Sequence, residues 1–170
     1  LLDWSRAQTG TLKFNPEKIN INRLVAENIE LLESTARNKN IKIYSELSND
    51  LFAIADKNMV RTIIRNLISN AIKYTNQGGI IKIQSYTGKD FCELTIADNG
   101  IGISSENIDK LFKIDESFST IGTEREKGTG LGLILCKEFV EKNGGELWVK
   151  SQSNKGSTFS FTLPLPDPEF

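Results

Sequence analysis

A predicted β-hairpin sets the strongest limit on how this chain can fold. Apolar and polar residues alternate over 81–86 and again over 92–97, and a short turn around Gly88-Lys89-Asp90 separates the two segments. Alternation of this kind is typical of antiparallel strands that bury one face and expose the other. The chain is therefore expected to contain an antiparallel sheet whose buried face is covered by a second layer.

Segments with the period of helices alternate with further strand-like segments along the chain. Apolar residues recur at spacings of three and four in 21–37, 56–74 and 131–142, and a further short helix is expected at 104–111. Further strands are expected at 41–47, 51–55, 147–151 and 157–163, with the first two lying side by side. This order predicts an α+β fold, a two-layer α/β sandwich with a mixed, mostly antiparallel sheet of about five strands and about three helices on one face.

Composition excludes several classes of chemistry and of partner. The 170 residues contain no histidine, which rules out Ser-His-Asp triads, imidazole bases and histidine-containing metal sites. With 21 Lys+Arg against 22 Asp+Glu, the chain lacks the basic excess typical of nucleic-acid binding. No apolar run approaches the ~18 residues that span a bilayer, so no direct membrane insertion is expected. Any chemistry must use carboxylates, amides, amines, hydroxyls or the backbone.

The first polar constellation lies on the segment 56–74. At about 100° per residue, Asn66, Asn70, Lys73 and Tyr74 fall at roughly 0°, 40°, 340° and 80°, in one line that borders the apolar side. Amide oxygens suit Mg²⁺, and the Lys73 ammonium suits phosphate. Ordinary polar residues on a partly solvated helix face would give the same line.

The second constellation is the segment DNGIGI at 98–103, where the second hairpin strand ends. Gly100 and Gly102 allow backbone conformations that other residues avoid, and they let a flat ligand approach closely. The Asp98 carboxylate can accept a hydrogen bond from an exocyclic amine, such as that of adenine. A plain turn at the strand end also fits these residues.

The third constellation is the glycine-rich segment GTGLGL at 128–133, which leads directly into a helix. Successive backbone N–H groups at a helix N-terminus form an anion site. The charged segment TEREK precedes the glycines where a dinucleotide-binding fingerprint needs a strand, and no P-loop sequence occurs. A simple flexible hinge is the alternative.

Together and in this order, the three segments resemble the ATP-binding domain of sensor histidine kinases. This Bergerat-type domain also occurs in gyrase, the heat-shock chaperone ATPases and the mismatch-repair ATPases. The segments are similar to the N, G1 and G2 boxes of that family, and 111–113 resembles its F box. The usual second aromatic residue of the F box is replaced by Asp115, and Phe118 is displaced, so the packing of the lid cannot be carried over.

The resemblance implies that Asn66 and Asn70 hold Mg²⁺, that Asn70 and Lys73 are catalytic, and that Asp98 binds the adenine amino group. It also implies that the loop 113–127 forms a lid over ATP. The ATP-binding residues that it implies are Asn66, Asn70, Lys73, Tyr74, Asp98, Gly100, Gly102, Ile103, Lys127, Gly128, Thr129, Gly130, Leu131, Gly132, Leu133 and Thr158.

The same resemblance implies a place in a larger protein. Residues 1–10 resemble the end of a dimerisation helix, 11–165 form the ATP-binding domain and 166–170 a tail. The implied partners are the protein's own phosphoacceptor domain and the receiver domain of a response regulator, in a full-length homodimer. The domain is expected in the cytoplasm, with the full-length protein either soluble or anchored in the inner membrane.

Without a histidine, the chain alone is expected not to phosphorylate itself. Two other readings stay open from the sequence. One is a nucleotide-binding interaction module without phosphoryl transfer, and the other is a related serine kinase of the anti-sigma type or a hydrolysing ATPase.

Overall fold

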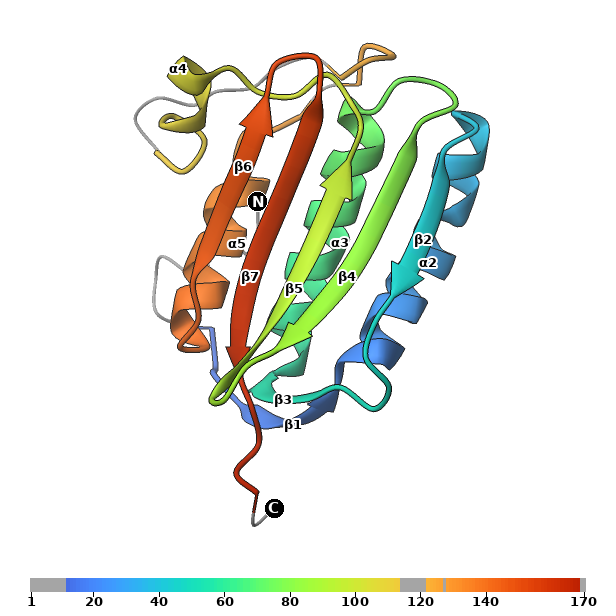
Figure 1. The fold of residues 1–170 in the computed structure, drawn as a ribbon. Coiled ribbons are helices and arrows are strands. Elements are labelled where there is room, and N and C mark those ends of the chain that lie inside the picture. The colour runs from blue at the N-terminus through green and yellow to red at the C-terminus, as the bar shows by residue number, and fades with distance from the viewer. Residues whose placement is uncertain (1–11, 114–121, 127, 169–170) are drawn as a thin grey trace.

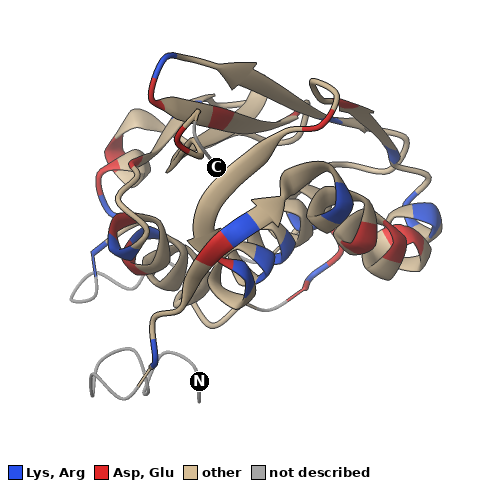
Figure 2. Ribbon diagram, turned by 90° about the horizontal axis from the view of Figure 1, so that it is seen from below, with Lys and Arg blue, Asp and Glu red and all other residues tan. Residues whose placement is uncertain are grey.

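A helical layer covers one face of a β-sheet in the computed structural model, which describes residues 12–113, 122–126 and 128–168 (Figure 1). Helices α2, α3 and α5 lie on the same side of the sheet, and Figure 2 shows the two layers edge-on. Within the described residues the elements are β1 (Pro16–Asn20), α2 (Ile21–Asn38), β2 (Lys42–Glu46), β3 (Phe52–Asp56), α3 (Lys57–Tyr74), β4 (Ile80–Thr87), β5 (Phe91–Asp98), α4 (Ser105–Ile108), α5 (Gly132–Lys142), β6 (Leu147–Gln152) and β7 (Gly156–Pro164).

The main sheet has five strands in the order β2-β4-β5-β7-β6. The predicted hairpin forms β4 and β5, with Thr87 opposite Cys92 and Ile81 opposite Asp98. Strand β7 pairs antiparallel with both β5 and β6, while β2 joins β4 in parallel. The expectation of a mixed, mostly antiparallel sheet with helices on one face is confirmed.

Helix α3 is the central element of the helical layer. The Asp56 side chain caps its N-terminus by accepting a hydrogen bond from the Met59 backbone N–H at 3.0 Å. Its apolar side is fully buried and packs between α2, α5 and the sheet, with Ile63, Ile64 and Ile68 at 0% exposure. Because this side is fixed against the core, the polar side of α3 has one possible orientation.

The expected pairing of strands 41–47 and 51–55 is wrong. Strand β2 pairs with β4, whereas β3 turns away from the main sheet and pairs antiparallel with β1, a strand that was not expected. Strand β1 gives little signal because it begins with a proline and only Ile19 on it is buried. The hydrogen bond from the Lys42 N–H to the Gly79 carbonyl starts β2 beside β4 instead.

The ends of the predicted domain remain predictions. The expected end of a dimerisation helix at 1–10 lies outside the described residues, and β7 ends at Pro164, just before the predicted tail. None of the helices in the described part of the chain combines the length and the apolar character needed to cross a bilayer.

Candidate nucleotide site

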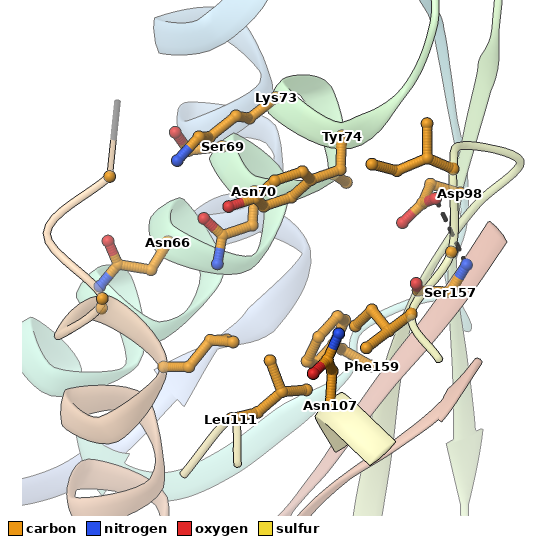
Figure 3. Close-up of a pocket in the computed structure, with 18 of the residues that line it drawn as sticks. Asn66, Ser69, Asn70, Lys73, Tyr74, Asp98, Asn107, Leu111, Ser157 and Phe159 are labelled. Carbon is orange, nitrogen blue, oxygen red and sulfur yellow. Dashed lines mark hydrogen bonds between the residues drawn. The ribbon is translucent and has the colours of Figure 1, made fainter. Parts of the chain in front are cut away.

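A cavity of about 440 Å³ opens at the end of the two layers, within the size range of small-molecule sites. Helix α3 forms one side of the cavity, and the segment after β5 with the start of β7 forms another (Figure 3). The glycine-rich segment before α5 closes a third side. The three constellations predicted from the sequence therefore meet at one pocket.

The wall from α3 carries the first constellation. Asn66, Asn70, Lys73 and Tyr74 all line the cavity, together with Ser69 from the same side of the helix (Figure 3). The Lys73 Nζ lies 4.9 Å from the centre of the Tyr74 ring. Because the opposite side of α3 is in the core, this wall presents amide oxygens and one ammonium group to the pocket.

Asp98 lies across the cavity, at the end of β5, with its carboxylate turned toward the pocket (Figure 3). Its Oδ1 accepts hydrogen bonds from the backbone N–H groups of Gly100 at 2.9 Å and Ser157 at 3.3 Å. Burial raises the pKa of Asp98, and these two hydrogen bonds offset that effect only in part. Among the described residues Oδ2 has no hydrogen-bond partner, so it can accept one from a ligand.

The loop after Asp98 is fixed by close backbone contacts. A Cβ atom on Gly100 would lie 2.1 Å from the Tyr74 carbonyl oxygen, and one on Gly102 would lie 1.9 Å from that of Gln152. Gly102 also has a φ of +66°, which favours glycine. Gly102 lines the pocket, whereas Gly100 does not and instead allows the loop to approach the end of α3. The second constellation is thus a tightly packed support for Asp98 as well as part of the wall.

The glycine-rich segment brings backbone N–H groups to the same pocket. The lining residues here are Gly128, Thr129, Gly130, Gly132 and Leu133. The N-cap residue of α5, Leu131, makes no side-chain hydrogen bond to the first turn, although its own N–H donates to the Thr129 Oγ1 at 3.4 Å. The N–H groups of the first turn are therefore candidate donors to an anion. The run also passes beside the α3 wall, because a Cβ atom on Gly132 would lie 3.8 Å from the Asn66 Oδ1.

The structure does not bring every predicted residue into the pocket. Leu131 is the N-cap of α5 and lies outside the lining, and Lys127, Asp115 and Phe118 lie outside the described residues. Thr158 is also outside the lining.

Strand alternation explains the position of Thr158. Ser157 pairs with Asp98, and Ser157 and Phe159 both line the pocket. Neighbouring side chains on a strand point to opposite faces, so Thr158 points away from the pocket between them. Ser157 therefore takes the place that Thr158 was expected to occupy.

Several lining residues were missed by the sequence analysis. Ser69 could have been found, since it falls beside Lys73 on the polar line of α3. Leu111 belongs to the segment that resembles the F box but was not among the expected ATP-binding residues. Phe159 is a buried apolar residue and gave no signal that separates it from the core. The other missed lining residues are Ala71, Ile101, Ser104, Asn107, Ser153 and Ser157.

Burial also explains why neither cysteine belongs to the site. Cys92 and Cys136 are both free and buried, and burial raises the pKa of Cys136 to about 12. That thiol is therefore protonated at neutral pH and is a poor nucleophile or metal ligand.

The chain matches the family of histidine kinase-, DNA gyrase B- and HSP90-like ATPases over residues 55–167. It is 36% identical over 171 residues to the adaptive-response sensory kinase SasA of Prochlorococcus marinus (strain MIT 9215), covering 97% of this chain and 46% of that protein. It is 31% identical to the sensor histidine kinase WalK of Bacillus subtilis (strain 168), covering 99% of this chain and 28% of that protein. The chain thus spans less than half the length of these relatives.

Solved structures of histidine kinases are also similar to this chain. The nucleotide-free catalytic domain of the histidine kinase ThkA is 33% identical with a TM-score of 0.76, over 90% of this chain and 96% of that one. ThkA in complex with the response regulator protein TrrA is 25% identical with a TM-score of 0.78, over 97% of this chain and 47% of that one. This chain therefore belongs to the histidine kinase-, DNA gyrase B- and HSP90-like ATPase family, as a catalytic domain of the sensor histidine kinase type.

Proposed function

We propose that the pocket binds ATP with Mg²⁺ and presents the γ-phosphate to a histidine on a separate dimerisation domain. The observation that carries this proposal is the arrangement of Asn66, Asn70 and Lys73 on one side of the cavity and the unpartnered Asp98 Oδ2 on another. Such a cavity offers an acceptor for a base at one place and donors and amide oxygens for phosphates at another.

The base would bind beside Asp98. Its exocyclic amine would donate a hydrogen bond to Oδ2, while the backbone N–H groups of Gly100 and Ser157 hold Oδ1 in place. Phe159 and Leu111 give this part of the pocket apolar surface for a flat ring, and Gly102 and Ile103 lie on its wall. Adenine meets these requirements, whereas guanine carries a carbonyl oxygen where adenine carries the amine.

The phosphates would bind between α3 and the glycine-rich segment. Lys73 and the backbone N–H groups at the start of α5 provide positive charge and donors for them. The amide oxygens of Asn66 and Asn70 fit Mg²⁺, which usually combines a few protein oxygens with those of the phosphates and with water. When bound, Mg²⁺ would neutralise negative charge that develops on the transferred group.

The acceptor must come from outside this chain, which has no histidine. An acceptor imidazole nitrogen would form a bond to the γ-phosphorus while the bond to the β–γ bridging oxygen breaks and ADP leaves. Asn70 and Lys73 would align and neutralise the phosphates during that step. The phosphoryl group would then pass to a response-regulator aspartate, a partner class supported by the complex of ThkA with TrrA.

We also propose where the domain acts and in what assembly. The domain would act in the cytoplasm within a homodimer that carries the phosphoacceptor domain. The support comes from the resemblance to SasA and WalK, which are named as sensory kinases.

Replacing Asn70 by alanine tests the proposed binding mode. Because Asn70→Ala removes an amide at the metal and phosphate position, we expect the affinity for Mg-ATP in isothermal titration calorimetry to fall by about tenfold or more. Asn58→Ala is the matched control, since Asn58 is exposed in the first turn of the same helix. Equal affinity of Asn70→Ala and the wild type, or no ATP binding by the wild type, would disprove the proposal.

A further inference from the structure

Lys39 is a buried cation outside the pocket. It follows α2 as the C-cap residue, and it is only 2% exposed. Burying an ammonium group is costly unless it is paired and hydrogen-bonded. The partners of this side chain therefore have to account for its position.

The partners of Lys39 come from two separate parts of the chain. Its Nζ lies 2.9 Å from the Ile72 carbonyl oxygen and 3.1 Å from that of Lys73, in the last turn of α3. The same Nζ lies 2.6 Å from the Thr123 Oγ1 and 2.9 Å from the Glu126 Oε1. One buried ammonium thus joins the C-terminal end of α3 to the segment 122–126.

The segment 122–126 is folded against the end of α3. The Gly122 N–H donates to the Glu126 carbonyl oxygen at 2.9 Å, which closes a turn. The Thr123 N–H donates to the Lys73 carbonyl oxygen at 3.1 Å, and the Thr123 Oγ1 lies 3.1 Å from the Thr75 carbonyl oxygen. This turn ends two residues before Gly128, so its position limits where the glycine-rich segment can lie.

Lys39 and Glu126 attract each other as opposite charges, in addition to the hydrogen bond between them. Burial tends to raise the pKa of Glu126, but hydrogen bonds from Lys39 and from backbone N–H groups outweigh burial and lower that pKa. Glu126 is therefore ionised at neutral pH and forms an ion pair with Lys39, whose side chain is 3% exposed. Lys39 is also placed at the negative end of the α3 dipole.

We propose that Lys39 is a positioning residue for the triphosphate part of the nucleotide. By holding the 122–126 turn against the last turn of α3, it sets the distance between Lys73 and the glycine-rich segment. The base end of the pocket, at Asp98, has no contact with Lys39 among the described residues. Lys39 therefore acts on phosphate binding and not on base binding, and this inference rests on the proposed function.

Competition titrations against a fluorescent ATP analogue test this division between phosphates and base. The variants are Lys39→Met, Lys39→Arg, Glu126→Gln and the double variant Lys39→Met/Glu126→Gln. We expect Lys39→Met to weaken Mg-ATP binding by about tenfold and AMP binding by less than about twofold, because only the phosphate end is displaced. Lys39→Arg keeps the charge and should recover part of the ATP affinity.

Variants of Glu126 test whether Lys39 affects ATP affinity through its ion pair with Glu126. Glu126→Gln should lower ATP affinity in the same direction, and the double variant should lose less than the sum of the two single losses on a free-energy scale. Arg37→Met is the matched control, because Arg37 lies two residues earlier and pairs with Glu33 on the exposed surface. This control should leave both affinities unchanged.

Equal weakening of ATP and AMP by Lys39→Met, or no change in ATP affinity, would overturn the inference. If Lys39→Met does not fold, Glu126→Gln decides the question, since it leaves Lys39 bonded to α3. An unchanged ATP affinity in Glu126→Gln would then overturn the inference. A wild type that binds no ATP would overturn the proposed function as well, so the two failures are distinguishable.

Discussion

At the scale of single residues, Asp98 shows how the site keeps an acceptor available for a ligand. Both of its hydrogen bonds go to Oδ1, and burial raises its pKa above the usual 3.8. An acid whose folded-state pKa is raised contributes stability below its unfolded pKa and loses that contribution as the pH rises through the folded value. At neutral pH the ionised Asp98 therefore costs stability, as buried binding groups often do.

Asp98→Asn should raise stability and weaken nucleotide binding. Asparagine keeps the Oδ1 acceptor but places an NH₂ group where Oδ2 would meet the adenine amine. Loss of a hydrogen bond to a charged group costs about 1.5–3 kcal/mol, so ATP affinity should fall by roughly 10- to 150-fold. In thermal melts at pH 7, each ~1 kcal/mol gained would raise Tm by about 2–4 °C.

The pH dependence of the melting temperature separates this effect from a general gain in stability. The advantage of Asp98→Asn over the wild type should shrink as the pH falls through the raised pKa of the folded Asp98, and it should be lost below the unfolded value of 3.8. Asp90→Asn is the control for affinity, because Asp90 is exposed in the turn at the opposite end of β5. An advantage that stays constant between neutral and acidic pH would contradict the role assigned to burial.

At the scale of elements, the loop after β5 depends on two backbone contacts. Gly102→Ala would place a Cβ atom 1.9 Å from the Gln152 carbonyl oxygen, at a φ of +66°. The loop must then move, and Gly102 lines the pocket, so we expect ATP affinity to fall by about tenfold. The positive φ adds a cost of roughly 1–2 kcal/mol to the stability.

Gly144→Ala isolates the cost of the positive φ. Gly144 has a φ of +79°, and a Cβ atom there would meet only the Pro164 Cγ, at an ordinary 3.8 Å. Urea unfolding should show a similar backbone cost in this variant, while calorimetry should show unchanged ATP affinity. Equal ATP affinity in Gly102→Ala would show that the contact with Gln152 does not position the pocket wall.

Elements with a strong local pattern, such as α3 and the hairpin of β4 and β5, could be predicted from the sequence, whereas the pairing of β3 with β1 could not. The apolar side of α3 determines where Asn66, Asn70 and Lys73 point, so the period alone located that wall. Which side chains of β7 face the pocket depends on its register with β5, so the sequence did not show that Ser157 and Phe159, and not Thr158, line the pocket.

The remaining misses have the same physical origin. Strand β1 is short, mostly exposed and begins with proline, so its pairing with β3 was not visible. Lys39 gave no signal of its role in the sequence, because its partners are 33 to 87 residues away in the chain. Long-range contacts of this kind leave no local pattern.

At the scale of the whole molecule, the chain has the proposed ATP site but lacks the proposed acceptor. Incubated alone with γ-labelled Mg-ATP, it should bind nucleotide and acquire no acid-labile label, since it contains no histidine. Label should appear on a histidine-containing dimerisation domain of the same protein when that domain is added. Asn70→Ala should reduce the rate of this labelling by at least about tenfold.

Two results would argue against this division of roles. Acid-labile label on these 170 residues alone would show that the acceptor is not a histidine. ATP binding without any label on the added acceptor domain would favour a nucleotide-binding module that transfers no phosphate.

The pocket is built from both layers of the fold, with Asp98 and Phe159 on the sheet and Asn66, Asn70 and Lys73 on α3. A nucleotide that contacts both walls binds only where the two layers are packed together, as in the folded state. At a ligand concentration a hundred times the Kd, such binding adds about 2.7 kcal/mol to the free energy of unfolding. The resistance of the domain to unfolding would then follow the ATP level of its surroundings.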